Sequence, residues 1–333
     1  MKNKLRIIAL WLTPILVIIG SLQLGATENL SIQELTQYII NYFSSSDLLH
    51  DVPIETILWQ VRLPRILLTF LVGAALATSG GVLQAIFRNP IVDPFTLGIS
   101  SGAAFGAALA MLIPVLSLNF TAFFFGVCAV AMTYAVSYAG QKASLIGMVL
   151  SGIIVSGVFT ALLTVLQYLS DPYKLQAIVQ WTMGNLHTAS WAKLHTAFFP
   201  IVIGLGVIIM LRWKLDLLSL GDDEAKAVGV NPKWLKLILI SVATMITASS
   251  VAAVGVISLF GLIVPHISRM LFGPSNHINV WANLSIGGTF LLVIDNFSRA
   301  VMPFEIPVGV FTMIIGAPVF IYLMRKNIMN WNA

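Results

Sequence analysis

The chain has 333 residues, of which 58% are hydrophobic and only 9% are charged. Soluble domains carry about 25% charged residues, so this composition excludes an ordinary soluble protein and predicts an all-α integral membrane protein. The single cysteine, Cys128, lies in an apolar run, which excludes a disulfide framework and a thiolate metal cluster. The net charge of +5 comes from basic residues at the ends of apolar segments. Basic residues in these places set the orientation of membrane helices, so they do not indicate a nucleic-acid partner.

The first apolar segment, residues 5–25, is long enough to span a bilayer, but it also resembles the start of a secretory signal. We expect a retained helix, because the rest of the chain is membranous and a cleaved signal would reverse the start of the topology. The longest polar stretch follows at residues 26–61. We expect an outer loop there, with an amphipathic surface helix around residues 32–43.

Nine further apolar segments follow, at residues 66–86, 95–113, 120–139, 145–169, 195–211, 235–254, 256–272, 281–298 and 306–324. Residues 235–272 fit either one long helix or two short helices joined near Gly255, and both remain open. Both chain ends are basic, so we expect both termini in the cytoplasm and an even number of crossings, which ten satisfies. We predict a single transmembrane domain, residues 1–333, with about ten helices in a compact bundle. Whether the bundle consists of two related halves remains open.

Small residues recur inside the apolar segments, as at 73–75, 79–81 and 287–288, and they predict close helix packing in lipid. The segment at 256–272 is short and contains Pro265, which is typical of broken helices that line a cavity in transporters.

Three arginines, Arg62, Arg65 and Arg299, are expected at the outer face, against the positive-inside tendency. One interpretation is snorkelling or an ion pair with a neighbour such as Asp295. The other is a docking site for carboxylates of a soluble partner, because guanidinium binds carboxylate in a bidentate fork. Both remain open from the sequence.

An inner turn is expected after the second segment, because Pro90 and Pro94 disfavour helix at Asn89 and Asp93. It is either a simple turn or a gate element. His266 and Arg269 form a further inner polar cluster, without the second ligand that a metal site needs. We therefore assign no metal.

The polar run at residues 221–230 lies within a cytoplasmic loop predicted at 212–234, and it is expected to contact a cytoplasmic partner. Catalytic and nucleotide-binding motifs are absent from the sequence, so we assign no catalytic residue and expect no ATP hydrolysis by this chain alone.

Five ordered motifs carry a family resemblance: RLPR at 62–65, GGVLQAIFRNPIVDPFTLGISSGA at 80–103, GDDEAKAVGV at 221–230, GLIVPHISR at 261–269 and EIPVGVFTMIIGAPVFIYLMR at 305–325. Together they resemble the FecCD family of ABC importer permeases, which carry iron-siderophores, haem or cobalamin across the bacterial inner (plasma) membrane. Some relatives carry molybdate-type oxyanions. The resemblance implies no cofactor on this chain.

The resemblance also implies partners. A second permease copy would share the pathway, as a homodimer or a pseudo-dimer. Two ATP-binding cassette subunits would bind below and use ATP and Mg, and a periplasmic or lipid-anchored substrate-binding protein would bind above.

By position in these motifs, the resemblance implies docking residues at Arg62, Arg65 and Arg299. It implies ATPase-coupling residues at Gly221, Asp222, Asp223, Glu224, Ala225 and Gly229. It also implies gate residues at Asn89, Pro90 and Ser144.

Two rival classes are weaker. An ion-coupled secondary transporter needs paired carboxylates near the middle of the bilayer, where this chain offers only Asp295. A membrane-embedded enzyme needs His, Asp or Glu clustered at one membrane face, and the sequence has no such cluster. The cargo remains open.

Overall fold

The protein is described by a computed structural model that covers residues 2–24, 52–138, 145–300 and 305–331. Its helices, in chain order, are α1 (Lys2–Gln23), α3 (Val52–Thr56), the π-helix η1 (Ile57–Arg62), α4 (Leu63–Phe87), the short 3-10 helix η2 (Pro94–Leu97), α5 (Ile99–Leu112), α6 (Leu118–Tyr138), α7 (Leu145–Leu169), α8 (Pro172–Thr182), α9 (Trp191–Leu220), α10 (Asp222–Ala227), α11 (Pro232–Val254), α12 (Phe260–Phe272), α13 (Asn276–Ala300) and α14 (Val308–Trp331). This part of the chain contains helices and no strand.

Each of the ten apolar segments forms a helix. Seven helices in the described ranges are long and apolar enough to cross a membrane, and three shorter apolar helices, at 99–112, 260–272 and 308–321, complete the set. The predicted all-α membrane fold is therefore confirmed.

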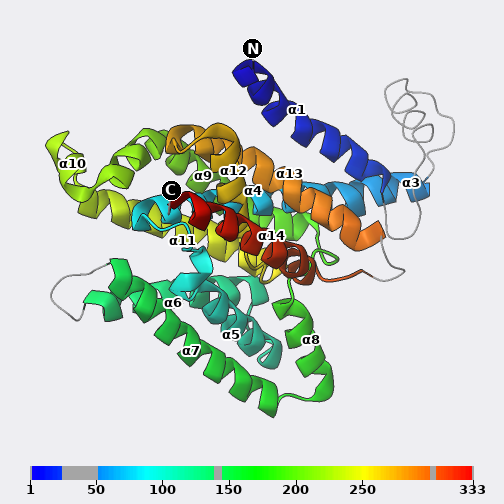
Figure 1. Ribbon diagram of the computed structural model, residues 1–333. Helices are drawn as coiled ribbons and strands as arrows, with labels where there is room; N and C mark the ends of the chain where they lie inside the picture. Colours follow the sequence, from blue (N-terminus) through cyan, green and yellow to red (C-terminus); the bar gives the residue numbers. More distant parts are fainter. Residues whose placement is uncertain (1, 25–51, 139–144, 301–304, 332–333) are drawn as a thin grey trace.

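The bundle has two distinct ends. In Figure 1, α10 lies at one extreme of the molecule, and α3, which leads into α4, lies at the other. We call these the α10 end and the arginine end, because Arg65 stands in the first turn of α4.

The central helix is α4, which packs against α13, α9, α11 and α12 and is buried along most of its length. Glycines set its closest contacts. A Cβ atom on Gly73 would collide with the carbonyl oxygen of Gly287 on α13, and one on Gly80 would collide with the carbonyl oxygen of Gly261 on α12. The predicted close packing through small residues is confirmed at these positions.

Residues 235–272 form two helices rather than one. Helix α11 ends at Val254, and α12 begins at Phe260 after a break whose ends both have positive φ, 78° at Gly255 and 62° at Leu259. The break lies ahead of Pro265, which sits inside α12. Because Gly261 at the start of α12 meets Gly80 deep in α4, α12 begins inside the bundle rather than at its surface.

Some boundaries differ from the predictions. Helix α9 continues to Leu220, so residues 212–220 of the predicted loop are helical and the connection to α11 begins at Gly221. Residues 52–61 of the predicted outer loop are also helical and run directly into α4. The predicted surface helix at 32–43 lies outside the described residues. Helix α8 was not predicted, although Asp171 caps it through the backbone N–H of Lys174 at 3.0 Å.

Candidate functional site

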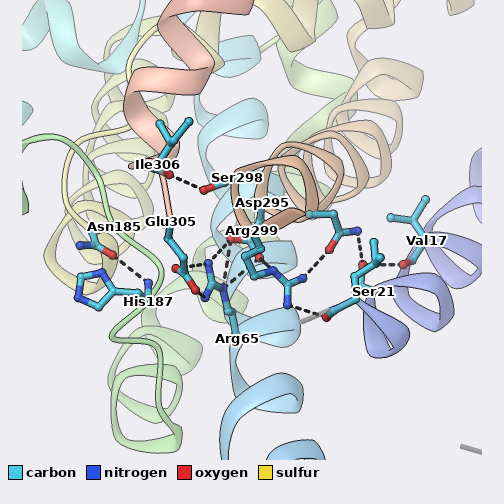
Figure 2. Close-up of polar contacts among 12 residues, drawn as sticks. Val17, Ser21, Arg65, Asn185, His187, Asp295, Ser298, Arg299, Glu305 and Ile306 are labelled. Carbon is cyan, nitrogen blue, oxygen red and sulfur yellow. Dashed lines mark hydrogen bonds and ion pairs between the residues drawn. The ribbon is translucent and has the colours of Figure 1, made fainter. Parts of the chain in front are cut away.

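Four charged side chains meet at the arginine end, and we call them the arginine cluster: Arg65, Asp295, Arg299 and Glu305. Arg65 comes from the first turn of α4, Asp295 and Arg299 come from the last turns of α13, and Glu305 precedes α14. Figure 2 shows the two carboxylates facing the guanidinium of Arg65. The cluster therefore joins three segments that are far apart in the sequence.

Arg65 uses most of its donors within the chain. Its Nη1 and Nη2 donate to the two carboxylate oxygens of Glu305 at 2.8 and 2.9 Å, in a bidentate fork. Its Nη2 also donates to Asp295 Oδ1 at 2.8 Å, and its Nε donates to Asp295 Oδ2 at 3.1 Å. The Asp295 side chain is fully buried, whereas Glu305 keeps 25% exposure. Glu305 is thus the outermost carboxylate on Arg65.

The other two arginines tie α1 to this end. Arg299 Nε lies 3.4 Å from Asp295 Oδ2, and Arg299 Nη1 donates to the backbone carbonyl of Leu24 at 3.0 Å. Arg62 donates to the carbonyl of Leu22 and is also buried. The ion pair with Asp295, one of the two interpretations open from the sequence, is therefore present for Arg65 and Arg299. The docking role stays a prediction, in which an incoming carboxylate has to compete with Glu305.

His187 is a neighbour of the cluster that sequence analysis missed. It lies between α8 and α9 and lines a small cavity of about 40 Å³ with Arg65, Asn185 and Glu305. Burial lowers the pKa of its imidazole, and Glu305 opposes that shift. No local pattern places His187 near Glu305, because they are brought together only by the fold.

The predicted coupling residues lie on and around α10. Ala225 is fully buried and anchors this short helix, whereas Asp223 and Glu224 are exposed. Gly229 has φ of 79° and makes the turn toward α11. The pair formed by Asp223 and Lys226, 2.8 Å apart, holds the pKa of Asp223 below its ordinary value.

Asp222 behaves differently from its two acidic neighbours. It accepts from Lys236 Nζ on α11 at 2.6 and 2.7 Å, and Arg88 Nη2 lies 3.5 Å away. Gly221, with φ of 159°, ends α9 and starts α10. Asp222 therefore fixes α10 to the bundle, while Asp223 and Glu224 face outward.

The predicted gate residues Asn89 and Pro90 lie in an ordered turn after α4, as expected. Asn89 Oδ1 accepts from the backbone N–H of Ile91 at 3.0 Å, and Asp93 Oδ1 accepts from that of Phe95 at 3.0 Å. Burial raises the pKa of the Asp93 carboxyl to about 6. Ser144, the third predicted gate residue, lies outside the described residues.

The same turn borders a cavity of about 220 Å³, which we call the inner cavity. Its lining residues are Gln84, Ala85, Arg88, Asn89, Pro90, Ser219, Arg269, Pro274 and Asn276. The fold therefore brings the predicted gate residues Asn89 and Pro90 together with Arg269 of the predicted inner polar cluster.

A second polar junction, also missed from the sequence, joins α9 to α13 beside the inner cavity. Asp216 near the end of α9 accepts from the backbone N–H of Asn276 at 2.5 Å and from His277 Nδ1 at 2.8 Å, so it caps the start of α13. The Asn276 amide donates to Ser219 Oγ at 2.7 Å, and the Trp213 ring stacks on His277 at 3.8 Å. Because α13 also carries Asp295 and Arg299, one helix connects this junction to the arginine cluster.

In the ranges that the structure describes, no group of three or more His, Cys, Asp or Glu side chains is arranged to hold a metal ion. Charged groups instead gather at the two ends of the bundle. They are paired within the chain at the arginine end, and they include exposed acids at the α10 end.

Comparison with known proteins gives a consistent result. Residues 12–326 match the model of the FecCD transport family. The chain is 39% identical to the molybdate import system permease protein MolB of Haemophilus influenzae, over 96% of each chain. It is 35% identical to a probable iron chelatin transport system permease of Helicobacter pylori, over 90% of this chain and 92% of that one.

Among solved structures, the chain is similar to an inward-facing metal-chelate type ABC transporter, with a TM-score of 0.86 and 38% identity. The match covers 97% of this chain and 99% of that chain. The likeness therefore extends over the whole bundle, including both ends described above.

Proposed function

The chain belongs to the FecCD transport family of ABC importer permeases, and from this premise we propose that it carries an iron-siderophore, haem or cobalamin-type metal chelate into the cytoplasm. The observation that carries this proposal is the near-complete likeness to a metal-chelate type ABC transporter. We place the chain in the bacterial inner membrane, with both termini in the cytoplasm.

A second cargo has a specific observation in its favour. The relative that is 39% identical is named as a molybdate permease, so a molybdate-type oxyanion is the alternative. One assay distinguishes the two cargoes. It measures uptake of labelled ferric chelate and of labelled molybdate by proteoliposomes that contain the assembled transporter and its binding protein. Uptake of molybdate alone would overturn the metal-chelate proposal.

Energy would enter through two ATPase subunits at the α10 end. The support is the exposure of Asp223 and Glu224 on a helix that Ala225 and Asp222 hold against the bundle. When the ATPase subunits close around ATP, α10 would pass the motion to α9, and the Asp216 cap would pass it to α13. Two packings of similar energy are then enough for alternating access along an interface with a second permease copy.

The binding protein would dock at the arginine end, through carboxylates that reach Arg62, Arg65 and Arg299. Arg65 holds Glu305 in the geometry that such a carboxylate would take. Docking would therefore exchange one carboxylate for another and loosen the segment that leads into α14.

The coupling role is tested by Asp222→Asn, Asp223→Asn and Glu224→Gln combined in one variant. We expect loss of uptake and of transport-coupled ATPase stimulation, because the partner would lose the exposed charges of Asp223 and Glu224 and α10 would lose the contact of Asp222 with Lys236 that fixes it. Asp171→Asn is a matched control, since it removes an exposed acid near α8 and Asn still caps a helix. Normal uptake by the triple variant would refute the role of α10. Uptake without any ATPase subunit would favour a secondary transporter.

A further inference from the structure

The inner cavity has an unusual charge balance. Two guanidinium groups, those of Arg88 and Arg269, line it, and no carboxylate does. Arg88 follows α4 directly, and its side chain is 42% exposed, whereas Arg269 stands half-buried in the last turn of α12. The cavity is therefore a positively charged recess beside α10.

Arg269 is held in place by neutral groups. Its Nη2 donates to Gln84 Oε1 at 2.5 Å, and Gln84 Nε2 donates to the backbone carbonyl of Gly261 at 3.1 Å. Within the described ranges, no carboxylate lies within ion-pair distance of Arg269. The carboxyl end of α12 favours a cation but supplies only part of a counter-charge. A half-buried guanidinium whose partner is a neutral amide is stabilised when an anion binds beside it.

Two carboxylates that contact residues lining the inner cavity, Asp222 and Asp216, are already engaged. Asp222 binds Lys236 at 2.6 and 2.7 Å and reaches Arg88 only at 3.5 Å. Asp216 accepts from the start of α13 and from His277. Neither can neutralise Arg269 without giving up one of these contacts, so the described part of the chain leaves Arg269 without a counter-ion.

We propose that the inner cavity receives an acidic side chain of the ATPase subunit, which pairs with Arg269 and Arg88. This inference rests on the proposed function, because it requires an ATPase at the α10 end. Position favours a protein carboxylate over a free anion. Ser219 of the lining lies three residues before the start of α10, and Arg88 already contacts Asp222 of α10, so the cavity continues the surface that carries the coupling residues.

The assembled complex tests this contact. Arg269→Gln and Arg88→Gln should each weaken retention of the ATPase about tenfold or more, because a partner carboxylate would be left without its guanidinium. Arg269→Lys should restore part of the loss, since it keeps the charge but not the fork. Lys233→Gln is the matched control: it removes an exposed cation at the same end that does not line the cavity.

Arg88→Gln keeps the test decisive if Arg269→Gln lowers the yield of folded protein, because Arg88 is largely exposed. Unchanged ATPase retention in both variants overturns the inference. Unchanged retention with lower molybdate uptake also overturns it, in favour of a free oxyanion. If the unaltered chain itself retains no ATPase, the proposed function fails, and the inference fails with it.

Zero-length cross-linking identifies the partner group directly. Arg88→Lys introduces an amine into the cavity, and a carbodiimide then joins that amine to any carboxylate in contact with it. We expect a new cross-linked peptide between the permease and an Asp or Glu of the ATPase, absent from the unaltered complex. A cross-link to Asp222 alone, in a complex that retains its ATPase, would contradict the proposal.

Discussion

The two ends of the bundle differ in how their charged side chains are paired. At the arginine end, buried arginines meet Asp295 and Glu305 inside the chain, and the cluster is largely neutralised there. At the α10 end, Asp223 and Glu224 face outward, and Arg269 has a neutral amide as its partner. The first arrangement ties helices together without help, whereas the second leaves exposed acids and a guanidinium without a carboxylate partner available to another molecule.

This contrast changes how the predicted binding residues are understood. Arg65 is first a tether between α4, α13 and the segment before α14, and a docking protein would have to compete for it. At the α10 end, Asp223 and Glu224 are exposed, and the surface pair of Asp223 with Lys226 costs little to break. We therefore expect substitutions at the arginine end to affect stability, and exposed substitutions at the α10 end to affect partners only.

The largest effect on stability is expected from Asp295→Asn. Removal of this buried carboxylate leaves the guanidiniums of Arg65 and Arg299 without their shared counter-ion, at a cost of about 3–5 kcal/mol. Thermal unfolding of the purified protein in detergent measures the loss, with Asp171→Asn as an exposed control. An unchanged unfolding temperature would show that the arginines are solvated and that the two ends do not differ as described.

A pH effect is expected from Asp93, in the turn after α4. Burial raises the pKa of its carboxyl to about 6 from an ordinary 3.8, so the folded state gains a proton relative to the unfolded state between these values. Its contribution to stability is complete below about pH 4 and is lost as the pH rises through 6, by roughly 3 kcal/mol. Unfolding measured at pH 5 and pH 7 should show a smaller difference for Asp93→Asn, whose amide oxygen still accepts from Phe95. An equal difference in both proteins would rule Asp93 out.

A smaller effect is expected from Glu305→Gln, which weakens the outer fork on Arg65. Loss of these charge-assisted hydrogen bonds costs about 1.5–3 kcal/mol, less than at Asp295 because Glu305 is partly exposed and Arg65 keeps Asp295. Under the docking proposal, the same variant should bind the binding protein more tightly, since a competitor is removed. Titration of the binding protein against both permeases measures this, and weaker binding would contradict the exchange.

The smallest effect is expected from Asp223→Asn. The pair with Lys226 is exposed to water, where such pairs add almost nothing to stability. We expect an unchanged unfolding temperature together with weaker ATPase stimulation. A clear loss of stability would mean that α10 belongs to the folded core, and the contrast between the ends would weaken.

Much of the fold was predictable because lipid imposes a simple rule, that long apolar segments become helices. The rule does not say where one apolar segment is divided into two helices. The break between α11 and α12, where Gly255 and Leu259 take positive φ, was therefore ambiguous from the sequence. Helix α8 was missed because it is too short and polar for the same rule. Its signal, Asp171 followed by Pro172, is a helix start that only local capping chemistry reveals.

The site residues divide in the same way. Asp295 and Arg299 are four residues apart on one helix, so their contact could be anticipated. Glu305 on Arg65, Asp216 on the start of α13, and Gln84 on Arg269 join residues that are 60 to 240 positions apart. No spacing in a single sequence predicts such pairs.

The sequence by itself determined the all-α membrane fold, the family and the polar character of residues 221–230, because composition, hydropathy and ordered motifs are local properties. Only the tertiary structure decided which charges are paired. Arg65 and Arg299 contact carboxylates within the chain, whereas Arg269 contacts a neutral amide, because the packing of the helices decides which groups meet. That difference is why one end holds the bundle and the other is open to a partner.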